Sequence, residues 1–126
     1  MATAARIAEV AKGAVAANLV GQTPLTTLAS VMAQCAVIVG GDSGPTHLAV
    51  GVGTPVVGLY GVTDPVRTGP HWGAARTITL DFAEADAPPA SRRARHPTVG
   101  DALARIPAVA VAEATQQLLS GETVRL

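Results

Sequence analysis

The 126-residue chain is poor in cysteine, aromatic side chains and charge. A single cysteine excludes an intrachain disulfide and a CxxC metal site. Aromatic residues make up only 2% of the chain, so alanine, valine and leucine must fill the core. Nine basic residues balance nine acidic ones. We therefore expect no nucleic-acid partner, because such binding usually needs a basic surface.

Long apolar runs and several common motifs are also missing. No apolar run reaches the roughly 18 residues of a membrane-spanning helix, and the first residues, MATAARIAEVAKG, lack the apolar region of a secretory signal. We therefore expect a cytoplasmic protein. The three histidines, at positions 47, 71 and 96, have no metal-ligand spacing, so we expect no metal. The absence of GxSxG, GxGxxG and the P-loop weighs against hydrolases, dinucleotide oxidoreductases and P-loop enzymes.

Helix-like and strand-like segments alternate along the chain. Apolar residues at helical spacing predict helices over 2–12, 24–34, 45–50 and from Pro107 onward. In the second of these helices, Thr23 is the expected N-cap and Pro24 the first helical residue. Short runs rich in β-branched residues predict buried strands over 36–40 and 55–61, and weaker strands over 18–20 and 75–80. Segment 81–106, dominated by Pro, Ala and Arg, is expected to be irregular and mobile.

This alternation predicts one α/β domain with a mainly parallel sheet. In such sheets, ligands bind beyond the carboxyl ends of the strands. Residues 40–47 and 61–70 follow two successive predicted strands. The two loops richest in polar side chains should therefore lie at the same edge of the sheet.

The first of these loops has the sequence GGDSGPTH, in which Gly40 and Gly41 are expected to let the backbone leave the strand sharply. The residues that follow are Asp42, Ser43, Gly44, Pro45, Thr46 and His47. Proline suits the first turn of a helix. The backbone N–H groups near residues 44, 46 and 47 would then form an anion site at a helix start. The alternative is a plain capping sequence, with Asp or Ser at the N-cap.

The charged side chains in both loops leave alternatives open. A histidine at a helix start should be neutral, so His47 could bind a hydroxyl or phosphate oxygen, or a backbone carbonyl in the core. Asp42 could accept hydrogen bonds from sugar hydroxyls or anchor its own loop. Arg67 could neutralise a diphosphate or lie in solvent, and Thr63 and Asp64 could form a turn or cap. Beyond them, His71 and Trp72 share the loop, where the tryptophan could be a stacking platform or a lid over the edge of the core, and we favour the lid.

The motif GGDSGPTHLAVGVGTPVVGLYGVTDPVRTGP closely resembles the donor-binding region of glycosyltransferase family 9, the ADP-heptose:lipopolysaccharide heptosyltransferases. NLVGQTPLTTLASVMAQCAVIVG before it and IPAVAVAEATQQLL near the end also look like the family. The resemblance is strong over 17–70 and weak over 100–120. It implies a Rossmann-like sheet with flanking helices, as in an incomplete C-terminal domain of a GT-B glycosyltransferase. Residues 1–126 would then be a single partial donor domain, with the N-terminal acceptor domain absent.

The resemblance also implies roles for individual residues. The donor-binding turn would run from residue 42 to 47, with Asp42 on the sugar, Ser43 and Gly44 on the diphosphate, and His47 beside them. Thr63, Asp64 and Arg67 would belong to a donor loop. The general base would lie in the missing domain, so catalytic residues of this chain are unknown and the isolated chain is expected to be inactive. The donor would be ADP-heptose and the acceptor a lipopolysaccharide core, with no metal or other cofactor and peripheral association with the inner membrane.

The chain departs from the family pattern in ways that keep other functions open. Ala5 or a neighbour stands where the family has a glutamate for the nucleotide ribose, and Glu9 comes one turn too late. The family's first donor-domain strand is missing, which predicts an open sheet edge and self-association. The alternatives are a non-catalytic nucleotide-sugar-binding module and a degenerate domain kept for protein contacts.

Overall fold

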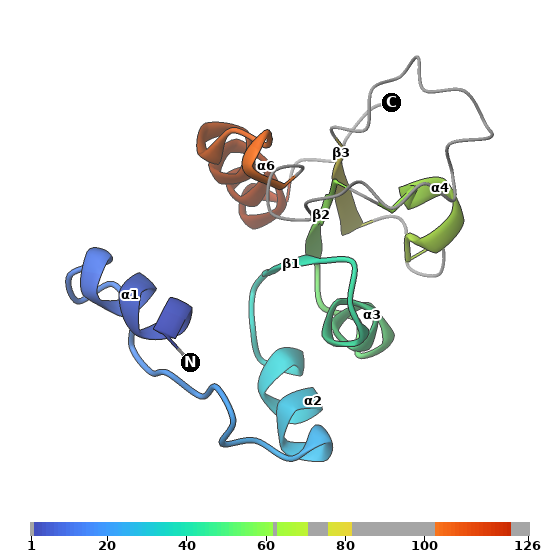
Figure 1. The fold of residues 1–126 in the computed structure, drawn as a ribbon. Coiled ribbons are helices and arrows are strands. Elements are labelled where there is room, and N and C mark those ends of the chain that lie inside the picture. Colours follow the sequence, from blue (N-terminus) through green and yellow to red (C-terminus); the bar gives the residue numbers. More distant parts are fainter. Residues whose placement is uncertain (1, 62, 71–75, 82–102, 122–126) are drawn as a thin grey trace.

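The computed structural model describes residues 2–61, 63–70, 76–81 and 103–121 (Figure 1). Its centre is a three-stranded parallel sheet in the order β1-β2-β3. The strands are β1 (Ile38–Gly41), β2 (Val56–Tyr60) and β3 (Thr77–Asp81). With helices on both faces, this sheet confirms the predicted α/β fold.

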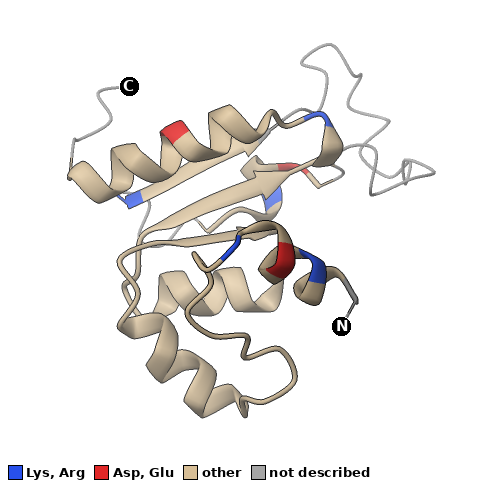
Figure 2. Ribbon diagram, turned by 90° about the vertical axis from the view of Figure 1, so that its left-hand side faces the viewer, with Lys and Arg blue, Asp and Glu red and all other residues tan. Residues whose placement is uncertain are grey.

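Helices cover the two faces of the sheet unequally (Figure 1). Helices α2 (Leu25–Ala33) and α3 (Gly44–Gly51) lie on one face and α6 (Ala108–Ser120) lies on the other. Val56 packs with the α2–α3 side and Val57 with the α6 side, because successive strand residues point to opposite faces. Strand β2 is thus buried on both faces, as predicted. Helices α2 and α3 carry no Lys, Arg, Asp or Glu (Figure 2), which suits their apolar packing.

Helix α1 (Ala2–Val10) lies apart from the sheet in Figure 1. Its Ile7 and Val10 are 59% and 69% exposed. The predicted helix over 2–12 is two residues too long, because Lys12 and Gly13 both have positive φ, which ends a right-handed helix.

Two N-terminal predictions are wrong for local reasons. Residues 18–20 form no strand, because the Asn18 side chain accepts a hydrogen bond from the Val20 N–H at 3.1 Å and a turn follows, in which the Gln22 N–H donates to the Leu19 carbonyl at 3.0 Å. Pro24, and not Thr23, occupies the N-cap of α2. With ψ of 160° the proline lies outside the helix, while its carbonyl accepts the Leu28 N–H at 2.9 Å.

The strand predicted over 36–40 forms as β1, two residues later at its start and one at its end. The expected burial on both faces is wrong, because Val39 is 45% exposed. Among the described strands, β1 has a neighbour on one side only. The irregular segment was expected from residue 81, but Asp81 still belongs to β3. Ile106 at its other end is buried, and residues 82–102 lie outside the described part of the chain.

The remaining elements follow the predicted order. Helix α4 (Pro65–Thr68) is a single turn after β2, within a segment expected to be loop. Helix α3 and strands β2 and β3 lie within two residues of their expected bounds. None of the helices in the described ranges is long and apolar enough to cross a bilayer.

Candidate functional site

The two loops singled out in the sequence meet at the carboxyl edge of the sheet. Asp42 follows the last residue of β1, and α3 begins two residues later. Strand β2 ends at Tyr60, beside β1, because Gly41 pairs with Leu59 in the register. Parallel strands bring their carboxyl ends to one edge, so the polar residues after β1 and after β2 become neighbours.

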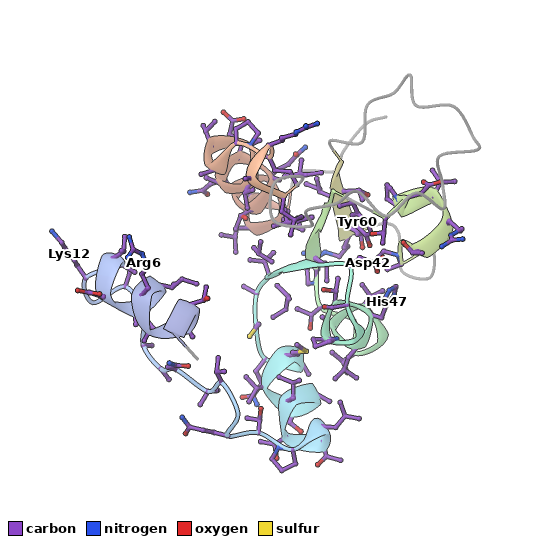
Figure 3. All side chains as sticks on the ribbon, in the orientation of Figure 1. Arg6, Lys12, Asp42, His47 and Tyr60 are labelled. Carbon is purple, nitrogen blue, oxygen red and sulfur yellow. The ribbon has the colours of Figure 1, made fainter. Side chains whose placement is uncertain are left out.

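Asp42 and His47 form the centre of this site (Figure 3). The His47 Nε2 atom lies 3.4 Å from the Asp42 Oδ1 atom. The Asp42 side chain is 16% exposed and that of His47 is 29% exposed. Both groups are therefore held by the fold and still open to a ligand from solvent.

The surroundings of Asp42 favour its ionised form. Burial would raise its pKa, but hydrogen bonds from Thr63, Thr68 and His47, with the charge interaction of His47, together lower it below the ordinary value of 3.8. Thr68 has one hydroxyl proton, and the Asp64 carbonyl lies 3.0 Å from the same oxygen. Thr68 cannot donate to Asp42 while it donates to the Asp64 carbonyl, which leaves Thr63 and His47 as the other partners of this carboxylate.

Thr46 ties the start of α3 to the end of β1. Its side chain is 2% exposed, and its hydroxyl donates to the Gly41 carbonyl at 2.6 Å. The Ser43 Oγ atom lies 3.3 Å from the Thr46 Oγ1 atom. Ser43 occupies the N-cap position but caps the helix with no side-chain hydrogen bond, and Pro45 lies in the first turn as predicted. The hydroxyls of this turn thus hold one another and the strand end.

The start of α3 leaves fewer free N–H groups for an anion than the sequence predicted. The N–H groups of Thr46 and His47 were expected to point out of the helix, but both approach the Ser43 carbonyl, at 3.1 and 3.3 Å. Three backbone N–H groups were expected to be free for an anion. Only that of Gly44, the first residue of α3, precedes the N–H groups that donate to the Ser43 carbonyl. The expected sharp exit at Gly40 and Gly41 is also wrong, since both belong to β1 and neither has positive φ.

In the second loop, Thr63 contacts the site and Asp64 caps the helix that follows. Thr63 reaches Asp42, which brings the two loops together. Asp64 is the N-cap of α4, where its Oδ1 atom accepts the Val66 N–H at 2.9 Å, so the capping interpretation holds for this residue. Arg67 is exposed and has no ion pair within the described residues. His71 and Trp72 lie outside them.

Sequence reasoning missed two residues of this site, Thr68 and Tyr60. Thr68 lies four residues after Asp64. A helical turn starting at Asp64–Pro65 places residues four apart on the same side, which would have indicated that Thr68 lies near the site. Tyr60 is the chain's only tyrosine and the last residue of β2, and its side chain is fully buried. A hydroxyl at the carboxyl end of a buried strand was the available signal.

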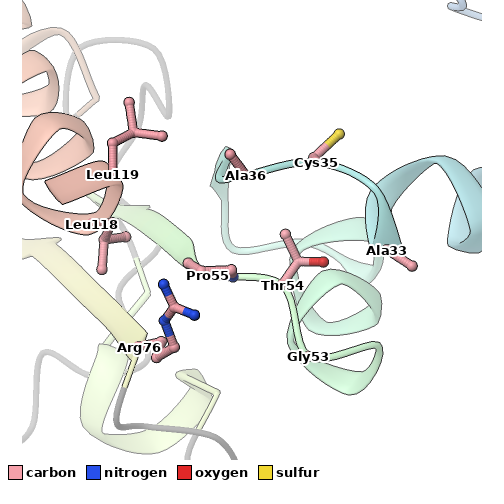
Figure 4. Close-up of a pocket in the computed structure, with 9 residues that line it drawn as sticks. All are labelled: Ala33, Cys35, Ala36, Gly53, Thr54, Pro55, Arg76, Leu118 and Leu119. Carbon is pink, nitrogen blue, oxygen red and sulfur yellow. The ribbon is translucent and has the colours of Figure 1, made fainter. Parts of the chain in front are cut away.

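A cavity of about 350 Å³ lies at the opposite, amino-terminal edge of the sheet (Figure 4). Cys35, Thr54, Arg76 and Leu118 are among its lining residues. It adjoins the carboxyl ends of α2 and α6, where backbone carbonyls carry partial negative charge, which disfavours a phosphate. No three metal-ligating side chains gather anywhere in the described ranges. The edge with Asp42 and His47 remains the better candidate site.

The parallel sheet and its polar carboxyl edge define an α/β domain of the Rossmann-like class. The chain belongs to glycosyltransferase family 9 (heptosyltransferase), whose sequence pattern matches residues 1–97. It is 41% identical over 54 residues to the lipopolysaccharide core heptosyltransferase OpsX of Haemophilus influenzae. It is also 41% identical over 63 residues to lipopolysaccharide heptosyltransferase 2 of Escherichia coli.

These matches cover only part of each protein. They span 43% and 50% of this chain, but 16% and 18% of the two relatives. No solved structure matches the chain. The comparisons therefore relate the chain to heptosyltransferases through a stretch well under two thirds of the relatives' length.

Proposed function

We propose that this chain binds the nucleotide-sugar donor of a heptosyltransferase reaction, with ADP-heptose as the donor. The reaction would transfer the heptose to a lipopolysaccharide core once an acceptor-binding domain completes the site. The observation that carries this proposal is the half-buried Asp42–His47 pair beside the start of α3, at the carboxyl edge of a parallel sheet. Membership of a heptosyltransferase family supports the choice of substrates.

The chemistry of the turn suggests which of its residues would bind the sugar and which the diphosphate of the donor. A carboxylate repels phosphate, so Asp42 would accept hydrogen bonds from sugar hydroxyls, for which its low pKa keeps it ionised. The Gly44 N–H at the helix start and the Ser43 hydroxyl would face the diphosphate. His47 would hold the carboxylate in place through its Nε2 atom. Transfer also needs a general base, which we expect on the acceptor side, and no cofactor or metal.

Location and assembly belong to the same proposal. A heptosyltransferase that uses a lipid-linked acceptor would work in the cytoplasm at the inner membrane surface. Among the described strands β1 has a neighbour on one side only, and this edge, next to the exposed Val39, would favour self-association when no other chain covers it.

Calorimetric titration of the purified chain with ADP-heptose, ADP, UDP and GDP tests the proposal. We expect saturable binding of ADP-heptose, weaker binding of ADP, and little binding of the other two nucleotides. Asp42→Asn should weaken ADP-heptose binding by about tenfold or more, because it removes a charged acceptor.

The matched control is Glu113→Gln, which removes a carboxylate from the exposed side of α6. It should bind ADP-heptose like the wild type. Thermal unfolding of each variant shows that the chain is folded. A folded wild-type chain that binds none of the four nucleotides would refute the proposed function.

A further inference from the structure

Tyr60 lies beneath the candidate site, in a space made by two paired glycines. A Cβ atom at Gly58 would lie 2.8 Å from the Tyr60 Cε2 atom, so the ring packs directly over Gly58. Gly58 pairs with Gly40 in the register, and a Cβ atom at Gly40 would lie 2.7 Å from the Thr46 Oγ1 atom. Because paired residues of parallel strands point to the same face, the ring and the start of α3 share one side of the sheet.

The Tyr60 hydroxyl is fully buried and has no hydrogen-bond partner within the described part of the chain. A buried hydroxyl without a partner is costly, and phenylalanine would fill the same space without that cost. Tyr60 follows Leu59 and Asp42 follows Gly41, so the Gly41–Leu59 pair makes the two residues neighbours at the carboxyl edge of the sheet (Figure 3), while the hydroxyl itself lies over Gly58. Burial, and then the negative charge of Asp42, raise the pKa of Tyr60, so the hydroxyl keeps its proton and can donate it.

We propose that Tyr60 is a positioning residue of the donor site, whose hydroxyl donates to the Asp42 carboxylate from the sheet side when a sugar occupies the solvent side. A carboxylate offers about four acceptor positions, so it can hold Tyr60 in addition to His47, Thr63 and a sugar hydroxyl. Tyr60 then contributes to recognition of the sugar and leaves the nucleotide contacts unaffected. This inference rests on the proposed function.

The test is the variant Tyr60→Phe, titrated with ADP-heptose and with ADP, which lacks the sugar. We expect the dissociation constant for ADP-heptose to rise about tenfold, as for loss of a hydrogen bond to a charged group. The constant for ADP should stay unchanged, and the melting temperature should not fall, because no hydrogen bond of the free protein is lost.

Thr54→Val is the matched control. The Thr54 side chain is also buried, but its hydroxyl donates to the Met32 carbonyl at 2.7 Å at the opposite edge of the sheet. Its removal should lower the melting temperature and leave both dissociation constants unchanged. The two variants thus separate loss of a structural hydroxyl from loss of a recognition hydroxyl.

Three results would overturn the inference. If Tyr60→Phe binds ADP-heptose as the wild type does, or loses ADP and ADP-heptose equally, Tyr60 does not position Asp42 for the sugar, while the proposed function stands. If the folded wild type binds neither compound, the proposed function fails and this inference fails with it.

Discussion

Two adjacent glycines of β1 should respond in opposite ways to the same substitution. Gly40 and Gly41 are consecutive in one strand and point to opposite faces. A Cβ atom at Gly40 would lie 2.7 Å from the Thr46 Oγ1 atom, closer than real Cβ atoms approach another heavy atom. At Gly41 the nearest atom would be the Leu59 carbonyl oxygen at 3.8 Å, an ordinary contact.

The contacts give the size of each effect. In Gly40→Ala the Thr46 hydroxyl must move, and its 2.6 Å hydrogen bond to the Gly41 carbonyl breaks. Overpacking and an unpaired carbonyl each cost about 1–3 kcal/mol, and the stiffer unfolded chain offsets about 0.4–1 kcal/mol. We expect a net loss of about 1–5 kcal/mol for Gly40→Ala. In Gly41→Ala only the stiffer unfolded chain acts, so this variant should be as stable as the wild type or more stable by up to about 1 kcal/mol.

Urea unfolding of the two variants and the wild type, followed by circular dichroism, measures these differences. The midpoint should fall clearly for Gly40→Ala and stay or rise for Gly41→Ala, with unchanged slopes. Equal losses in the two variants would refute the argument, because that result would mean that strand conformation, and not the approach of Thr46, sets the need for glycine.

Two further predictions concern the carboxylates of the site. Because Asp42 has a lowered pKa in the folded protein, it stabilises the fold above its unfolded pKa, and this contribution is lost as the pH falls through the folded value. The difference in unfolding free energy between wild type and Asp42→Asn should therefore shrink between about pH 5 and about pH 2, and a difference independent of pH would contradict this. Asp64→Ala should cost about 1 kcal/mol because the Val66 N–H loses its cap, and Asp64→Asn should cost much less. Equal melting temperatures for these two variants would show that the cap contributes nothing.

Short-range features of this protein could be predicted well from the sequence. The apolar β-branched run at Val56 indicates a buried strand, and the Asp64–Pro65 pair indicates a cap, because both depend on neighbours in the chain. Placing Asp42 and Thr63 at one edge also needed only the parallel order of the strands. The strand predicted at Asn18 fails because the Asn18 side chain bonds the Val20 N–H and so competes with strand pairing.

The sequence by itself determined the alternation of strands and helices, the family motif and the edge at which it lies. Only the tertiary structure decided which glycine of the Gly40–Gly41 pair must lack a side chain, which hydroxyls reach Asp42, and that the Tyr60 ring is buried over Gly58. The physical reason is that periodicity and capping act between residues a few positions apart. The close approach of Thr46 to Gly40 and the burial of the Tyr60 hydroxyl without a partner in the described chain instead depend on how β1, β2 and α3 pack against one another.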